Sequence, residues 1–88
     1  MSDPSALQQQ LALLWAQALG VDRVAPDDNF FALGGHSLLA VKMIGAIQDQ
    51  LALEAELSLS DLIENPTLAA FTARVEDLMA PGAETGTL

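Results

Sequence analysis

The stretch DDNFFALGGHSLLAVKMI, Asp27 to Ile44, joins a run of turn-forming residues to an apolar helical pattern. Two phenylalanines lead into a glycine pair, then into the chain's only histidine, His36, and into Ser37. From Ser37 to Leu51 the apolar residues fall on one face when wound at 3.6 residues per turn. A serine between a flexible turn and a helix can be a nucleophile, a helix cap or a point of covalent attachment.

The same period recurs elsewhere in the chain and predicts an all-α fold. We expect helices from about Pro4 to Leu19, from Ser37 to Leu51, over a short turn from Ser58 to Glu64, and from Pro66 to shortly before Pro81. Their predicted end signals are Asp3 as cap and Gly20 as stop for the first helix, Ser58 or Ser60 as cap for the third, and Asn65 as cap for the fourth. The fold class is a small four-helix bundle of three main helices and one short one.

The segment from Gly20 to His36 has no clear period, and a loop of this length in a small domain is usually functional. It carries five apolar residues, which we expect to tie it to the helices: Val21, Val24, Phe30, Phe31 and Leu33. At least one of the phenylalanines should be buried. The prediction is therefore a long but ordered loop.

Composition excludes several classes of protein. The chain has 88 residues, of which 51% are hydrophobic, enough for one domain with a modest core. It contains no cysteine and a single histidine, so a disulfide framework and a tetrahedral zinc site are not expected. It shows no secretory signal and no apolar run long enough to span a bilayer. We expect a cytoplasmic protein without a bound metal ion.

The charge is strongly acidic, with three Lys and Arg against twelve Asp and Glu and a formal charge of −9. Nucleic acids and anionic membranes would be repelled, so neither is an expected partner. A basic protein partner would be attracted. The charge can equally serve only solubility, and composition does not decide between the two.

A catalytic role for Ser37 is disfavoured. Gly35-His36-Ser37 matches the first half of a Gly-x-Ser-x-Gly elbow, but Leu39 stands where the second glycine belongs, and no strand precedes it. His36 is the neighbour of Ser37 and is badly placed to act as its base. We predict no catalytic residue.

The remaining readings of Ser37 are a cap and an attachment point. Serine before an apolar helical run is a common N-cap. The helical wheel, however, places Leu38 and Val41 away from the core face and beside Ser37, with Lys42 at the border. A helix start also offers free N–H groups and a partial positive charge, which favour a phosphate.

The stretch from Asp27 to Ile44 resembles the signature of peptidyl carrier proteins, or thiolation domains, of nonribosomal peptide synthetases, within the acyl carrier protein superfamily. That signature has an acidic residue, two aromatics, Leu-Gly-Gly-His/Asp-Ser-Leu and a helix. A weaker similarity continues through LSLSDLIENPTLAAF, Leu57 to Phe71, where Ile63 stands in place of the frequent phenylalanine. The resemblance covers nearly the whole expected fold.

The resemblance implies that Ser37 receives 4'-phosphopantetheine from coenzyme A through a phosphopantetheinyl transferase. The thiol of the arm would then hold an aminoacyl or peptidyl group as a thioester. Gly35 and His36 would adjoin the arm, and Leu38, Val41 and Lys42 would contact partners. The implied partners are the transferase, an adenylation enzyme and a condensation domain, with a thioesterase as a further candidate. We expect a monomer, with a carrier domain over residues 1–80 and a flexible tail over 81–88.

Two alternatives stay open at this point. The form Gly-Gly-His-Ser favours amino-acid or peptide cargo, because fatty-acid carriers usually show Asp-Ser-Leu without this Gly-Gly-His. One residue does not decide the cargo, since His36 can be an ordinary polar loop residue, and an acyl carrier of polyketide or fatty-acid synthesis is the alternative. The alternative from a different class is an unmodified helical adaptor that binds a partner helix. The sequence does not identify the cargo, the partner enzymes or the product, and it leaves open a free-standing or an excised carrier.

Overall fold

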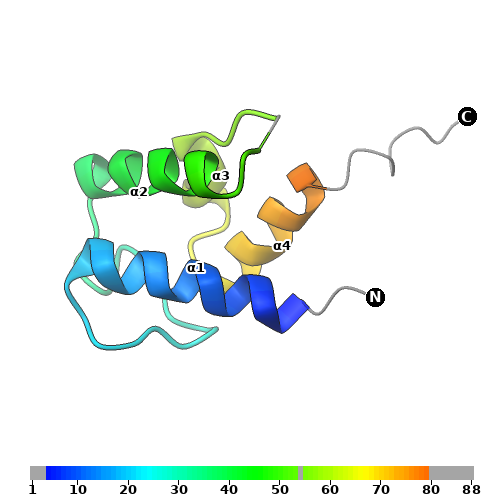
Figure 1. Ribbon diagram of the computed structural model, residues 1–88. Helices are drawn as coiled ribbons and strands as arrows, with labels where there is room; N and C mark the ends of the chain where they lie inside the picture. Colours follow the sequence, from blue (N-terminus) through cyan, green and yellow to red (C-terminus); the bar gives the residue numbers. More distant parts are fainter. Residues whose placement is uncertain (1–3, 54, 80–88) are drawn as a thin grey trace, which may run out of the picture.

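The computed structural model describes residues 4–53 and 55–79, which form four helices, as predicted. The helices are α1 (Pro4–Leu19), α2 (Ser37–Gln50), α3 (Leu59–Glu64) and α4 (Leu68–Met79). In Figure 1, α1 and α2 run alongside each other in opposite directions, and α4 lies across the end of α1 opposite the long loop. The short α3 lies behind α2 and contacts both α2 and α4.

The core is apolar and receives residues from all four helices and from the loop. The side chains that are fully shielded from solvent are Leu11, Trp15, Phe30, Ala40, Ile47, Leu62, Phe71 and Val75. Trp15 is at its centre, because its ring packs edge-on against Phe30 at 5.3 Å and lies 5.8 Å from Phe71. These aromatic contacts join α1, the loop and α4 in one core.

The predicted ends of α1 agree with the structure where it is described. The helix begins at Pro4, and the predicted cap Asp3 lies outside the described residues. Gly20 ends the helix with a φ of +73°, a conformation that glycine adopts at little cost. The N–H groups of Gly20 and Val21 both donate to the Ala16 carbonyl, so the last turn is closed.

The loop from Gly20 to His36 is ordered by both apolar and polar contacts, which confirms the prediction. Phe30 and Val24 are buried, and Val21, Phe31 and Leu33 pack against the core. The Asn29 side chain accepts hydrogen bonds from the Phe31 and Ala32 N–H groups and forms an Asx turn. The loop is thus part of the folded domain.

Backbone hydrogen bonds attach the same loop to the start of α4. The Phe30 N–H donates to the Pro66 carbonyl at 2.8 Å, and the Leu68 N–H donates to the Asp28 carbonyl at 3.1 Å. Asn29 and Thr67 form an isolated antiparallel bridge between the two segments. These bonds explain why a segment without helical period has a fixed place.

The prediction for the start of α4 was wrong. Asn65 does not cap this helix and Pro66 is not its first residue, because α4 begins at Leu68. Asn65 instead ends α3, where its side chain donates to the Asp61 carbonyl at 2.9 Å. The Thr67 hydroxyl accepts a hydrogen bond from the Ala70 N–H at 3.3 Å and takes the capping position. The Pro66 carbonyl is committed to Phe30, which holds Asn65 and Pro66 outside the helix.

The predicted tail, residues 81–88, lies outside the described residues. Within residues 4–53 and 55–79, none of the helices has both the length and the apolar character that a membrane crossing requires.

Candidate functional site

The start of α2 is exposed, and Ser37 stands in its first helical position. The N-cap is His36, whose backbone is extended, with φ −144° and ψ 175°. The His36 carbonyl accepts the first helical hydrogen bond, from the Ala40 N–H at 2.9 Å. The reading of Ser37 as the N-cap was therefore wrong by one residue, and this described helix start has no capping hydrogen bond from a side chain.

The turn before Ser37 is shaped by its two glycines in different ways. Gly34 has a φ of +101°, which favours glycine for its backbone conformation. Gly35 is needed for space, because a Cβ there would collide with the Phe30 ring and lie 2.7 Å from the Phe30 carbonyl oxygen. Gly35 was predicted only as a neighbour of the arm, and its packing against Phe30 has no local signal in the sequence.

The two faces of α2 differ as predicted. Ala40, Met43, Ile44 and Ile47 are buried and form the inner face. On the outer face, Leu38 is 63% and Val41 54% exposed, and Lys42 is exposed as well. Val41 lies one turn beyond Ser37, so the two share a side of the helix. We call Leu38 and Val41 the apolar patch.

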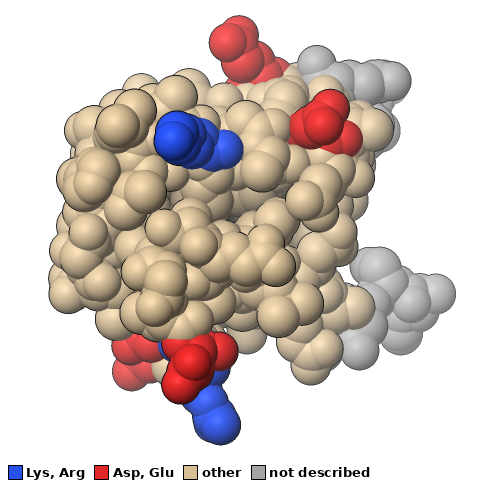
Figure 2. Space-filling model, turned by 60° about the vertical axis from the view of Figure 1, so that its left-hand side comes forward, with Lys and Arg blue, Asp and Glu red and all other residues tan. Residues whose placement is uncertain are grey.

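The charged side chains are unevenly distributed on the face shown in Figure 2. They lie along its upper edge and at its bottom, whereas the broad middle is uncharged. The first turn of α2 contains no acidic residue. The first turn of α2 therefore adds no negative charge of its own beside Ser37.

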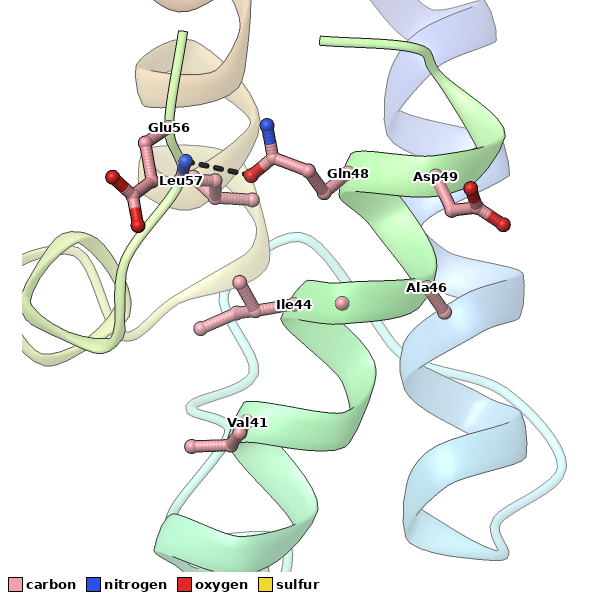
Figure 3. A pocket seen from close by; sticks show the side chains of 8 residues that line it. Val41, Ile44, Ala46, Gln48, Asp49, Glu56 and Leu57 are labelled. Carbon is pink, nitrogen blue, oxygen red and sulfur yellow. Dashed lines mark hydrogen bonds between the residues drawn. The ribbon is translucent and has the colours of Figure 1, made fainter.

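An open groove of about 710 Å³ continues from the apolar patch along α2. Figure 3 shows Val41 and Ile44 on α2 facing the segment that carries Glu56 and Leu57. Gln48 joins the two sides, because its Oε1 accepts from the Leu57 N–H at 2.8 Å, drawn as a dashed line. Its Nε2 also donates to the Leu53 and Ala55 carbonyls. No local pattern in the sequence predicts this bridging role of Gln48.

The start of α3 is closed by its own side chains. Asp61 Oδ2 accepts hydrogen bonds from the Ser58 N–H at 2.9 Å and from the Ser58 hydroxyl at 3.1 Å. Its Oδ1 accepts from Arg74 Nε at 2.8 Å, which ties α3 to α4. Burial alone would raise the pKa of Asp61, but the hydrogen bonds from the Ser58 amide, Arg74 and the Ser58 hydroxyl outweigh it and lower the pKa.

The other predicted site residues lie close to Ser37 in the chain but make few fixed contacts. His36 is exposed, and Gly35 is half-buried against Phe30. In the part of the chain that the structure describes, no group of three His, Asp or Glu side chains could hold a metal ion. The site consists of an exposed hydroxyl, a helix N-terminus and an adjoining apolar surface.

This arrangement corresponds to a known family. Residues 9–75 match the family model described as a phosphopantetheine attachment site, and the chain belongs to this family. The match includes all of α2 and α3, the loop and most of α1 and α4. The family binds its cofactor, 4'-phosphopantetheine, covalently, as the resemblance implied.

The curated relatives are much longer proteins. Over 70 residues the chain is 47% identical to malpinin synthetase from Mortierella alpina, covering 80% of this chain and 1% of the relative. Over 70 residues it is 44% identical to tyrocidine synthase 2 from Brevibacillus parabrevis, covering 80% of this chain and 2% of the relative. The chain thus spans only one to two per cent of the length of these relatives.

Solved structures share the helical bundle. A type-II acyl-carrier protein from Streptomyces verticillus involved in bleomycin biosynthesis has a TM-score of 0.79 at 37% identity, over 86% of this chain and 89% of that one. A peptidyl carrier protein, solved with the phosphopantetheine transferase Sfp and coenzyme A, has a TM-score of 0.75 at 31% identity, over 88% and 95%. The family and the fold identify a carrier domain, and the solved structures that share its fold include an acyl-carrier protein and a peptidyl carrier protein.

Proposed function

We propose that this domain carries aminoacyl or peptidyl intermediates as thioesters on a 4'-phosphopantetheine arm attached to Ser37, in nonribosomal peptide synthesis. The observation that carries the proposal is the hydroxyl of Ser37, which is exposed at the first position of α2 and has no capping role. The resemblance of the surrounding sequence to carrier signatures supports the same residue. The chain matches a segment that makes up one to two per cent of each synthetase, which supports a role as one domain of such a system.

The start of α2 fits a phosphodiester. The N–H groups in the first turn of a helix have no helical acceptor, and the helix dipole adds partial positive charge there. The first turn contains no carboxylate that would repel a phosphate. Attachment would form a bond between the Ser37 hydroxyl oxygen and phosphorus, break the pyrophosphate bond of coenzyme A and release adenosine 3',5'-bisphosphate, while the base of the transferase takes the hydroxyl proton. The N–H groups of the first turn would favour the resulting phosphate. When bound, the arm supplies a terminal thiol, which the chain itself lacks because it has no cysteine.

The chain acts in this proposal as a carrier and not as a catalyst. Its residues present Ser37, whereas a phosphopantetheinyl transferase supplies the base and the magnesium ion for attachment. Adenylation and condensation enzymes, with a thioesterase as a further candidate, then act on the thioester. The cytoplasmic location expected from the sequence stays a prediction, as does the extent of the carrier domain over residues 1–80.

The partner contacts in this proposal are the apolar patch and Lys42. Leu38 and Val41 are exposed, adjoin Ser37 and lead into the groove along α2. An enzyme that binds Ser37 would cover these side chains and remove apolar surface from water. Gly35 and His36 are the neighbours of the arm in the proposal, since they precede Ser37 directly.

The test has two stages. The chain is incubated with coenzyme A and the transferase Sfp, and its intact mass should rise by one phosphopantetheine. The product is then incubated with candidate adenylation enzymes, ATP and amino acids, and its mass should rise again by one aminoacyl group. Hydroxylamine should remove this aminoacyl group and leave the phosphopantetheine in place, as a thioester requires. No mass increase at the first stage contradicts a carrier role. Loading by acyl substrates alone at the second stage would assign the chain to acyl transfer instead of peptide synthesis.

A further inference from the structure

Phe30 contacts three separate parts of the molecule. Its ring is fully buried and packs edge-on against Trp15 of α1, with an angle of 78° between the rings. Its N–H donates to the Pro66 carbonyl, just before α4, at 2.8 Å. Its carbonyl accepts from the Gly35 N–H at 3.0 Å, two residues before Ser37. Phe30 therefore connects the core to the turn that leads into α2.

Phe30 leaves no room for a side chain at Gly35. A Cβ at Gly35 would collide with two carbons of the Phe30 ring and lie 2.7 Å from the Phe30 carbonyl oxygen. The backbone of Gly35 thus lies directly on the ring. Gly34 is different, because a Cβ there would meet nothing within 4 Å, and only its φ of +101° disfavours other residues.

The chain between this contact and Ser37 is short. Only His36, in an extended conformation, separates Gly35 from Ser37. Because His36 is exposed and its side chain does not cap the helix, the two residues before Ser37 are held chiefly from the Gly35 side. The buried inner face of α2 places the helix as a whole, and the contact of Gly35 with Phe30 adds a constraint on the turn that leads into Ser37.

We propose that Phe30 and Gly35 are positioning residues, and that their contact fixes the Ser37 hydroxyl in the place from which it is modified. This inference rests on the proposed function and adds residues that act through Ser37. A displacement of a reacting atom by about 1 Å can lower the rate by about a hundredfold. Gly35 is thus required because of a buried ring in the loop.

The experiment is a double-mutant cycle on the full chain with Gly35→Ala and Phe30→Leu. The value of kcat/KM for modification is measured with coenzyme A and Sfp, and the folded fraction by circular dichroism. Gly35→Ala should lower kcat/KM by about ten- to a hundredfold in the folded protein. In the Phe30→Leu background the same change should cost several-fold less, because leucine has no Cε atom and its Cδ methyl groups can rotate away from the new Cβ. The rescue is partial, since the Phe30 carbonyl oxygen remains near that Cβ.

Two glycine controls separate positioning from general damage. Gly34→Ala strains the same turn without touching Phe30, so Phe30→Leu should not rescue it. Gly20→Ala strains the end of α1, far along the chain from Ser37, and should leave kcat/KM per folded molecule unchanged. Trp15 is the only tryptophan and contacts Phe30, so its near-ultraviolet circular dichroism should change in Gly35→Ala but not in Gly34→Ala.

The outcomes distinguish this inference from the proposed function. If the parent chain is not modified at all, the proposed function fails first. If the parent is modified and folded Gly35→Ala is modified at the parent rate, the positioning role is overturned. It is also overturned if the loss in Gly35→Ala equals the loss in folded fraction, or if Phe30→Leu gives no rescue. Should Gly35→Ala not fold, Phe30→Leu alone decides, with several-fold slower modification of a folded protein expected and an unchanged rate contradicting the proposal.

Discussion

The starts of α2 and α3 differ in whether side chains cap them. At α3 the Asp61 carboxylate accepts hydrogen bonds from the Ser58 amide and hydroxyl, and Arg74 of α4 binds its other oxygen. At α2 the N-cap is His36, whose side chain makes no capping hydrogen bond, and the first turn has no acidic residue. Each start has a serine, but of the two only Ser58 takes part in capping within the described residues.

The difference shows that the start of α2 lacks a stabilising interaction that the start of α3 has. Capping a helix start is worth about 1 kcal/mol, and α2 forgoes it although Ser37 is only one position too late to cap. A capped start would place a side-chain oxygen on the N–H groups that a phosphate needs. The uncapped start and the apolar patch lie on the outer side of α2, and the opposite face of the helix is buried in the core.

The largest expected effect contrasts the two faces of α2. Ile47→Asp should unfold the domain, because it places an unpaired charge at a fully buried position. Val41→Asp and Leu38→Asp should leave the melting temperature nearly unchanged, because both side chains are more than half exposed. Both should slow modification by the transferase or loading by an adenylation enzyme.

Thermal unfolding and intact-mass assays of the three variants check this contrast. A folded Ile47→Asp protein, or an unfolded Val41→Asp protein, would mean that the inner and outer faces of α2 are assigned the wrong way round. Normal modification and loading of both patch variants would remove the partner role of the patch.

The next effect concerns Asp61. Asp61→Ala removes the acceptor for the Ser58 amide and the ion pair that joins α3 to Arg74, and should cost about 2–3 kcal/mol. For a domain of this size that lowers the melting temperature by about 10–20 °C. Rates of modification per folded molecule should stay close to the parent, because Ser37 is on another helix. An Asp61→Ala protein that melts with the parent would show that the start of α3 is not held as described.

A smaller effect appears in acid. The pKa of Asp61 is lowered in the folded state, so its contribution to stability is fully present above the unfolded value of about 4 and is lost as the pH falls through the folded pKa. Stability should therefore decline below about pH 4, and less steeply in Asp61→Asn, which cannot titrate there. Urea unfolding between pH 3 and 6 measures both slopes, and equal slopes would exclude Asp61 as a source of the decline. Glu64 and Asp77, whose charges also act on Arg74, are present in both proteins, so they do not contribute to the difference between the two slopes.

The helices could be predicted from the sequence because their signals are local. Gly20 ends α1, and the apolar residues of α2 follow its inner face from Ala40 to Ile47. The two wrong caps are also local signals, but tertiary contacts outweigh them. Asn65 is the C-cap of α3, and the Pro66 carbonyl accepts a hydrogen bond from the Phe30 N–H in the loop. Ser37 is the first residue of α2 because the extended residue before the helix is His36.

The site could be predicted only in part. The exposure of Leu38 and Val41 follows from the helical wheel alone. The packing of Gly35 on Phe30, the bonds of Gln48 to the segment before α3, and the pair of Asp61 with Arg74 join residues that are five to thirteen positions apart. Such contacts depend on how the elements meet, and a glycine pair in a sequence signals only a turn.

The central claim is that Ser37 is left free for attachment, and a matched pair of serine variants tests it most directly. Ser37→Ala and Ser58→Ala are each measured for thermal stability and for mass gain with coenzyme A and Sfp. The account predicts that Ser37→Ala gains no mass and keeps its stability within about 0.5 kcal/mol. Ser58→Ala should gain one phosphopantetheine and melt about 4–8 °C lower, since its cap is worth about 1 kcal/mol. Mass gain in Ser37→Ala would contradict the account.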